Sequence, residues 1–177
     1  MKKELQERNR LRTKRLEMVP FHKRYVEDLY ELWNDFNVIK YTYNPHCKTI
    51  TECEKRIDVF IEHTDLELMN NFVILLEEHA IGIIGSPIID KEQNVLGLYY
   101  QLARKHWGKG YISEAMCAFM EHIKKQLPNA HFKVEAVSDN KASIKILKKF
   151  GFKTVETKKA GFTLHGFCCN LVEFEKP

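Results

Sequence analysis

One stretch, from Lys105 to Ser113, constrains the fold of this chain more than any other. It has the sequence K-H-W-G-K-G-Y-I-S and separates a segment rich in Val, Leu and Tyr from one whose apolar residues repeat at helical spacing. Glycines allow positive φ angles and bring successive backbone N–H groups close together. The stretch therefore predicts a strand, a glycine loop and a helix in direct succession.

A junction of this kind is suited to binding an anion. The first N–H groups of a helix have no partner within the helix, and the helix dipole adds about half a positive charge there. The side chains of Lys105, Lys109 and Ser113 could reinforce the site. The loop has neither the GxxxxGK[ST] pattern of a P-loop nor the third glycine of a dinucleotide motif. A turn that only reverses the chain remains the alternative at this point.

Hydrophobic periodicity predicts the other elements. A helix lies between strand patterns around residues 95–138, which implies one parallel pair in an otherwise antiparallel sheet. The predicted class is α/β of the α+β type, with a single mixed sheet flanked by helices. The expected strands are 16–21, 72–76, 81–89, 95–102, 132–137, 152–157 and 167–174, and the expected helices are 22–36, one capped by Thr51 and Glu54, 110–126 and 141–150.

Composition narrows the class of protein. The 177 residues, 44% of them hydrophobic, suit one globular domain, and no apolar run approaches the roughly 18 residues of a membrane span. The first residues are charged where a secretory signal would be apolar, so a cytoplasmic protein without membrane contact is expected. Five cysteines without a CxxC pair indicate neither a disulfide framework nor a zinc site, and we expect no metal.

The basic residues are concentrated at the N-terminus. Residues 1–15 hold seven Lys and Arg side chains against Glu4 and Glu7, more than the whole formal net charge of +4. This basicity forms a tail and not a groove, so nucleic-acid binding is not expected. We divide the chain into a basic tail, residues 1–12, expected to be solvated and to fray, and a domain, residues 13–177.

A second group of residues follows the glycine loop in the sequence. Ser138, Asp139 and Asn140 join a strand to a helix, and Gly151 follows that helix as a C-terminal cap. Together with the order of elements and the loop, this group resembles the GNAT superfamily of acyl-CoA N-acyltransferases, whose loop is [Gln/Arg]-x-x-Gly-x-[Gly/Ala]. The T-K-R-L sequence at residues 13–16 and the N-x-x-S and K-F-G-F segments at residues 140–143 and 149–152 further resemble the branch that acetylates ribosomal-protein N-termini.

The resemblance implies acetyl-CoA as the cofactor and a role for each matching residue. Strand 99–102 would splay from the next parallel strand and pair with the pantetheine arm. A backbone N–H near Tyr100, Gln101 or Leu102 would polarise the thioester carbonyl, and Asn140 would contact pantetheine. The pyrophosphate would be held by the loop and helix start, comprising Lys105, Trp107, Gly108, Lys109, Gly110, Tyr111, Ile112 and Ser113.

Two positions depart from the family pattern. Lys105 stands where the family has Gln or Arg, which keeps a charge but loses the planar geometry. Leu147 stands where many relatives have a tyrosine acid, so Ser143 becomes the candidate for protonating the leaving thiolate. Glu135, on the strand beside the acyl site, is the candidate general base. A solvent-facing or lysine-paired Glu135 is the competing interpretation.

The predicted reaction is acetyl transfer from acetyl-CoA to an α-amine of a protein or peptide, by direct attack in a ternary complex. At pH 7 a lysine amine costs about 4.6 kcal/mol to deprotonate and an α-amine about 1.2 kcal/mol, so only the lysine needs a strong base. A small-molecule acceptor, such as a polyamine, amino acid or antibiotic, and an acyl-CoA-binding protein with little turnover remain the alternatives. A monomer or homodimer is expected.

Overall fold

The computed structural model describes residues 10–66 and 69–177, so residues 1–9 of the predicted tail lie outside the described ranges. The strands are β1 (Leu11–Arg12), β2 (Glu17–Val19), β3 (Met69–Leu76), β4 (His79–Asp90), β5 (Val95–Leu96), β6 (Tyr99–Leu102), β7 (His131–Val137), β8 (Lys153–Leu164) and β9 (Phe167–Lys176). The helices are η1 (Lys23–Tyr25), α2 (Val26–Asn34), α3 (Phe36–Ile39), α4 (Ile50–Asp65), η2 (Arg104–His106), α5 (Tyr111–Gln126) and α6 (Lys141–Lys149).

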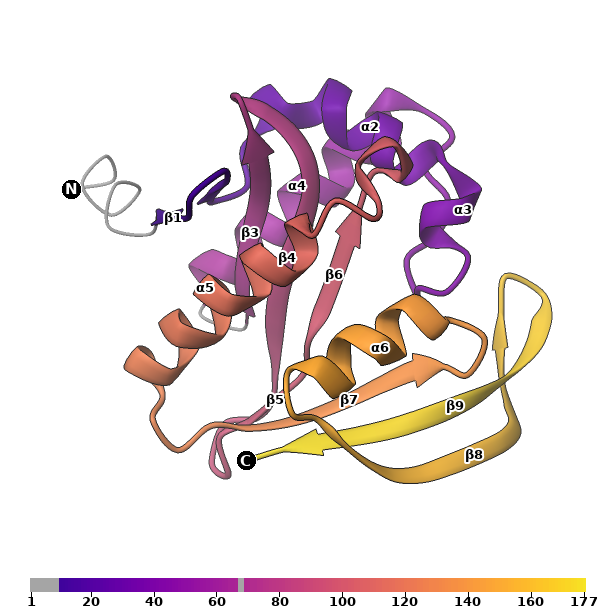
Figure 1. Ribbon diagram of the computed structural model, residues 1–177. Helices are drawn as coiled ribbons and strands as arrows, with labels where there is room; N and C mark the ends of the chain where they lie inside the picture. The colour runs from indigo at the N-terminus through magenta and orange to yellow at the C-terminus, as the bar shows by residue number, and fades with distance from the viewer. Residues whose placement is uncertain (1–9, 67–68) are drawn as a thin grey trace.

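Within the described ranges the nine strands form one mixed sheet. Its order is β1-β2-β3-β4-β5-β7-β9-β8, and β6 pairs with β4 off this path. The pairing of β5 with β7 is parallel and the other pairings are antiparallel. The predicted mixed, mostly antiparallel sheet with one parallel pair and flanking helices is confirmed (Figure 1). Within these ranges, no helix has the length and apolarity that a membrane span requires.

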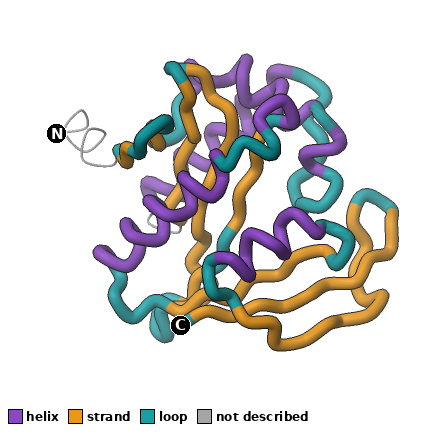
Figure 2. The backbone as a smooth tube through the Cα atoms, in the orientation of Figure 1, coloured by secondary structure: helices purple, strands orange, loops and turns teal. Residues whose placement is uncertain are grey.

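Helices cover both faces of the sheet (Figure 2). Because side chains alternate along a strand, successive residues of β3 enter different cores. Phe72 packs in one core with Phe119 of α5, and that core also holds Leu147 of α6. Val73 packs in the other core with Trp33 of α2, together with residues of α4.

The sheet opens between β6 and β7, which run in diverging directions (Figure 1). The sequence predicted a single strand at residues 95–102, and this prediction is wrong. β5 pairs with β7 through Leu96 and Phe132, but β6 pairs with β4. Gly97 marks the change of neighbour: its N–H donates to the carbonyl of Pro87, and a Cβ there would lie 2.8 Å from the proline ring. The strand-like pattern on both sides of Gly97 hid this break.

Two helix boundaries also differ from the predictions. The predicted helix at residues 22–36 is interrupted, because Asp35 is extended and its carboxylate accepts the N–H of Asn37 to start α3. The N-cap of α4 is Thr49 and not Thr51: the Thr49 hydroxyl accepts the Glu52 N–H, and the Glu52 carboxylate accepts the Thr49 N–H. Both threonines have a glutamate three residues later, so the capping pattern alone did not distinguish them.

The C-terminal hairpin is longer than predicted. Its two strands extend to a two-residue turn, in which His165 and Gly166 both have positive φ angles, 48° and 84°. Such turns match the twist of the strands they connect. The His165 ring nitrogen Nε2 lies 3.2 Å from the carbonyl oxygen of Ile39 and 3.1 Å from that of Thr42. These contacts hold the tip of the hairpin against the end of α3.

Candidate active site

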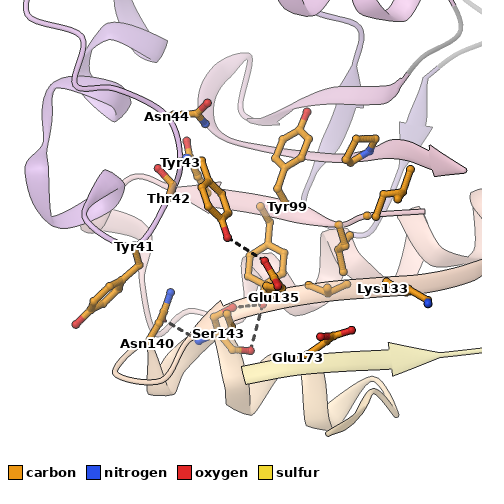
Figure 3. Close-up of a pocket in the computed structure, with 18 of the residues that line it drawn as sticks. Tyr41, Thr42, Tyr43, Asn44, Tyr99, Lys133, Glu135, Asn140, Ser143 and Glu173 are labelled. Carbon is orange, nitrogen blue, oxygen red and sulfur yellow. Dashed lines mark hydrogen bonds between the residues drawn. The ribbon is translucent and has the colours of Figure 1, made fainter. Parts of the chain in front are cut away.

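Two cavities adjoin where the sheet opens. The first, here called the loop groove, has a volume of about 600 Å³ and lies between the glycine loop, the start of α6 and residues 37–41. The second, here called the sheet cavity, has a volume of about 530 Å³ and extends along β6 and β7 (Figure 3). The two cavities share the lining residues Tyr41, Tyr100, Gln101, Asn140 and Ser143.

The glycine loop presents free backbone donors to the loop groove. Gly108 and Gly110 have φ angles of 74° and 80°, and Gly110 is the N-cap of α5. Among the described residues no side chain caps this helix start, so the first N–H groups of α5 remain available to an anion. A Cβ at Gly108 would meet no atom within 4 Å, so the loop is open on that side. The Trp107 indole N–H donates to the Leu102 carbonyl at 2.7 Å and fixes the loop to the end of β6.

Most of the predicted cofactor residues line the loop groove, but Lys105 and Lys109 have other contacts. The Lys105 ammonium pairs with Glu31 at 3.0 Å, and the Lys109 carbonyl accepts Arg15 Nη1 at 3.2 Å. The predicted residues in the lining are Tyr100, Gln101, Leu102, Trp107, Gly108, Gly110, Tyr111, Ile112, Ser113, Asn140 and Ser143.

The sequence did not single out several further lining residues of the loop groove. One is His106, which stands inside the predicted loop. Burial lowers the pKa of His106, and the charges of Lys109 and Lys105 lower it further. Four more, on and after α3, come from a segment about 70 residues earlier in the chain, and no local pattern connects Asn37, Val38, Lys40 and Tyr41 with the loop. The rest lie at the start of α6, beside the predicted Asn140 and Ser143: Asp139, Lys141, Ala142, Lys145 and Ile146.

Within the described ranges the outer edge of β6 has no neighbouring strand, and its backbone N–H groups face the opening. The Ala103 N–H donates to the Ile81 carbonyl of β4 at 2.8 Å. Since strand amides alternate between the two edges, the N–H groups of Tyr100 and Leu102 point away from β4, toward the opening before β7. The side chain of Gln101 lies on the opposite face of the sheet from that of Tyr100, and there it accepts the indole N–H of Trp33 at 2.8 Å.

Tyr100, Ser143 and Asn140 form a hydrogen-bonded chain where the cavities meet. The Tyr100 hydroxyl lies 2.8 Å from Ser143 Oγ and 3.2 Å from the Ser143 carbonyl oxygen. The Asn140 side chain accepts the Ser143 N–H at 3.1 Å and so caps α6 (Figure 3). Burial raises the pKa of Tyr100 to about 12, although the hydrogen bond with Ser143 opposes the shift. Tyr100 therefore keeps its proton at neutral pH. The sequence predicted a role for the backbone N–H of Tyr100 but not for its hydroxyl.

Glu135 faces the sheet cavity from β7. Its carboxylate accepts the Tyr43 hydroxyl at 3.0 Å, and the two side chains point toward each other in Figure 3. The other oxygen lies 3.2 Å from the Lys158 ammonium, which also pairs with Glu173 at 2.8 Å. Hydrogen bonds to Glu173 and Glu135 raise the pKa of Lys158. Glu135 is thus both lysine-paired, as one interpretation held, and in the wall of the cavity.

The site thus combines a groove with backbone N–H donors and an adjoining cavity with a carboxylate and two hydroxyls. This arrangement is expected of a group-transfer enzyme whose donor substrate is an anion. A family model for the GNAT acetyltransferase domain matches residues 15–153. The chain therefore belongs to the GNAT family, and it is an acetyl-CoA-dependent N-acetyltransferase.

Three similar proteins illustrate the relationship. The uncharacterized N-acetyltransferase p20 of Bacillus licheniformis is 29% identical over 148 residues, which cover 81% of this chain and 82% of that protein. The structure of RimL, a ribosomal-protein α-N-acetyltransferase in complex with coenzyme A, has a TM-score of 0.86 at 17% identity and covers 94% of this chain and 97% of its own. That of the microcin C7 self-immunity acetyltransferase MccE, with acetyl-CoA and AMP, has a TM-score of 0.84 at 20% identity and covers 93% of each chain.

Proposed function

We propose that this enzyme transfers the acetyl group of acetyl-CoA to the α-amine of a protein or peptide. The observation that supports this acceptor most is the environment of Glu135. Its carboxylate is already engaged by Tyr43 and by Lys158. Both carboxylate oxygens thus already have a hydrogen-bond partner. An α-amine with a pKa near 8 is partly neutral at pH 7 and needs little help from a base, whereas a lysine amine with a pKa near 10.4 needs a carboxylate that is free to take its proton.

The loop groove fits the cofactor in two respects. The open side of Gly108 and the uncapped start of α5 supply space and N–H donors for a diphosphate. The outer edge of β6 supplies donors to an extended pantetheine arm, and the N–H of Tyr100 or Leu102 would polarise the thioester carbonyl. Asn140 and Ser143, in the lining common to both cavities, would lie against the end of that arm.

The side chains at the junction would then hold and move protons. Bound acetyl-CoA supplies a thioester whose carbonyl carbon is attacked by the amine nitrogen, so that an N–C bond forms, the C–S bond breaks and a thiolate leaves. Ser143 would give its hydroxyl proton to the sulfur and receive the proton of Tyr100. Glu135 would accept the proton that the nitrogen loses, directly or through water. Exchange with solvent would then remove this proton from Glu135 and return one to Tyr100.

A small-molecule acceptor is the second candidate, because the microcin C7 self-immunity acetyltransferase MccE, with a TM-score of 0.84, has a structure in complex with the small molecule AMP as well as acetyl-CoA. A panel of amines with labelled acetyl-CoA separates the candidates. It should contain peptides with a free α-amine and no lysine, α-acetylated peptides with a free lysine, polyamines and amino acids. We expect labelling of the free α-amine peptides. Labelling confined to small amines would exclude the peptide acceptor, and tight CoA binding without thiol release for any amine would indicate an acyl-CoA-binding protein.

A further inference from the structure

The turn at residues 13–16, here called the N-terminal turn, lies beside the start of α5. It is closed by the Thr13 N–H, which donates to the Leu16 carbonyl at 2.9 Å, and it is held to the domain by Leu16 in the hydrophobic core. From this turn the Thr13 hydroxyl donates to Glu114 Oε1 at 2.6 Å. The backbone N–H of Arg15 donates to the same oxygen at 2.8 Å, and Arg15 Nε donates to Glu114 Oε2 at 2.7 Å.

These contacts engage an acidic side chain in the first turn of the helix that faces the loop groove. Glu114 carries a negative charge near the place where a diphosphate would bind, and like charges repel. Burial alone would raise the pKa of Glu114, but the hydrogen bonds from Thr13 and Arg15 lower it overall, so its charge persists. The guanidinium of Arg15 compensates this charge at a salt-bridge distance of 2.7 Å.

Arg15 also contacts the glycine loop itself. Its Nη1 donates to the Lys109 carbonyl at 3.2 Å, and its guanidinium carbon lies 4.4 Å from the centre of the Tyr111 ring. In a trans peptide the C=O and the following N–H point in opposite directions. The bond to the Lys109 carbonyl therefore directs the Gly110 N–H away from Arg15. Gly110 lines the loop groove, so this orientation suits an N–H donor to a bound anion.

We infer that Arg15 is a positioning residue for the diphosphate of CoA: it fixes the peptide between Lys109 and Gly110 and compensates the charge of Glu114, so that the loop is ordered before the cofactor binds. This role rests on the proposed binding of CoA in the loop groove. A loop that is ordered beforehand loses less conformational freedom when the cofactor binds. The affinity for the diphosphate should therefore depend on Arg15, which acts through the backbone of Lys109 and Gly110.

The test measures two ligands on the full chain by calorimetry, CoA and S-acetylpantetheine, which has the pantetheine arm but no diphosphate. For R15Q we expect the Kd for CoA to rise about tenfold and that for S-acetylpantetheine to stay within twofold. R15K keeps the charge but not the planar fork, and it should recover part of the loss. R12Q is the matched control, because Arg12 is 76% exposed and pairs with Glu17, next to the same turn; its affinities should not change.

The outcomes distinguish this inference from the proposed function. If the wild-type protein does not bind CoA, the proposed function fails and this role of Arg15 fails with it. If the wild type binds CoA and R15Q binds it within twofold, or if both ligands weaken equally, Arg15 is only structural and the inference alone is overturned. Should R15Q not fold, R15K decides by the same comparison: a loss confined to CoA supports the inference, and an equal loss or no loss overturns it.

Discussion

The loop groove and the sheet cavity adjoin, yet they are built in different ways. The groove takes its backbone N–H donors from the glycine loop, the start of α5 and the edge of β6, which are close in the sequence, although residues 37–41 and the start of α6 complete its wall. The sheet cavity presents side chains of segments far apart in the sequence, including Tyr43, Tyr99, Glu135 and Glu173. A backbone site changes little when side chains change, apart from its glycines. A side-chain cavity can acquire another acceptor while the groove keeps the same cofactor.

The largest effect should come from filling the groove at a glycine. G108V places a branched side chain in the open space of the loop and should raise the Kd for CoA about 100-fold, or about 2.7 kcal/mol, in calorimetry. Positive φ costs a non-glycine residue about 1–2 kcal/mol wherever it occurs. G166V is the matched control, because Gly166 also has positive φ and free space but lies in the β8–β9 turn. Equal weakening by both variants would mean that the loop does not bind the diphosphate through its backbone.

The sheet cavity should respond through side chains. We expect E135Q to lower kcat/KM for an α-amine peptide about tenfold at pH 7, since the variant cannot accept the amine proton. The loss should shrink as the pH rises to 9, because an amine with a pKa near 8 is then mostly neutral and needs no base. The Kd for CoA should stay unchanged, which steady-state kinetics and calorimetry together can check.

Glu173 provides the control for this variant. It lies opposite Glu135 in the β7–β9 register and shares Lys158, but the Tyr43 hydroxyl bonds to Glu135. E173Q should therefore lower kcat/KM much less than E135Q. If the two variants lose similar activity, or if the loss for E135Q does not depend on pH, Glu135 is not the base. Its negative charge would then only help to bind the acceptor.

The same contrast explains how much could be predicted from the sequence. The fold class and the position of the groove follow from local patterns: the change of period at Gly110 and the glycines before it place a strand, a loop and a helix in order. The break at Gly97 could not be predicted, because an apolar run does not show which neighbour a strand pairs with. The partners of Glu135 could not be predicted either, since Tyr43 and Lys158 reach it only through tertiary packing. Likewise the ion pair of Lys105 with Glu31 depends on how α2 packs.

The smallest effect concerns the point where the two cavities meet. Y100F removes the hydroxyl that contacts Ser143 Oγ at 2.8 Å, and we expect kcat to fall about fivefold with an unchanged Kd for CoA. The loss should be partial because Ser143 can still take a proton from solvent through a water molecule. Y99F is the comparison: Tyr99 also lines the sheet cavity, but its hydroxyl donates to Asn71, so this variant should reduce stability by about 1 kcal/mol and lower kcat less than Y100F does.

A leaving group of lower pKa sharpens this test. A thiolate that is stable without a proton does not need a donor, so with an acetyl thioester of an acidic thiol the wild type and Y100F should react at nearly equal rates. With acetyl-CoA the fivefold difference should remain. If Y100F is equally impaired with both thioesters, Tyr100 supports the shape of the junction and not proton transfer. Ser143 would then be the remaining candidate for the proton that the sulfur receives, and the Tyr100 hydroxyl would serve only to hold Ser143 in place.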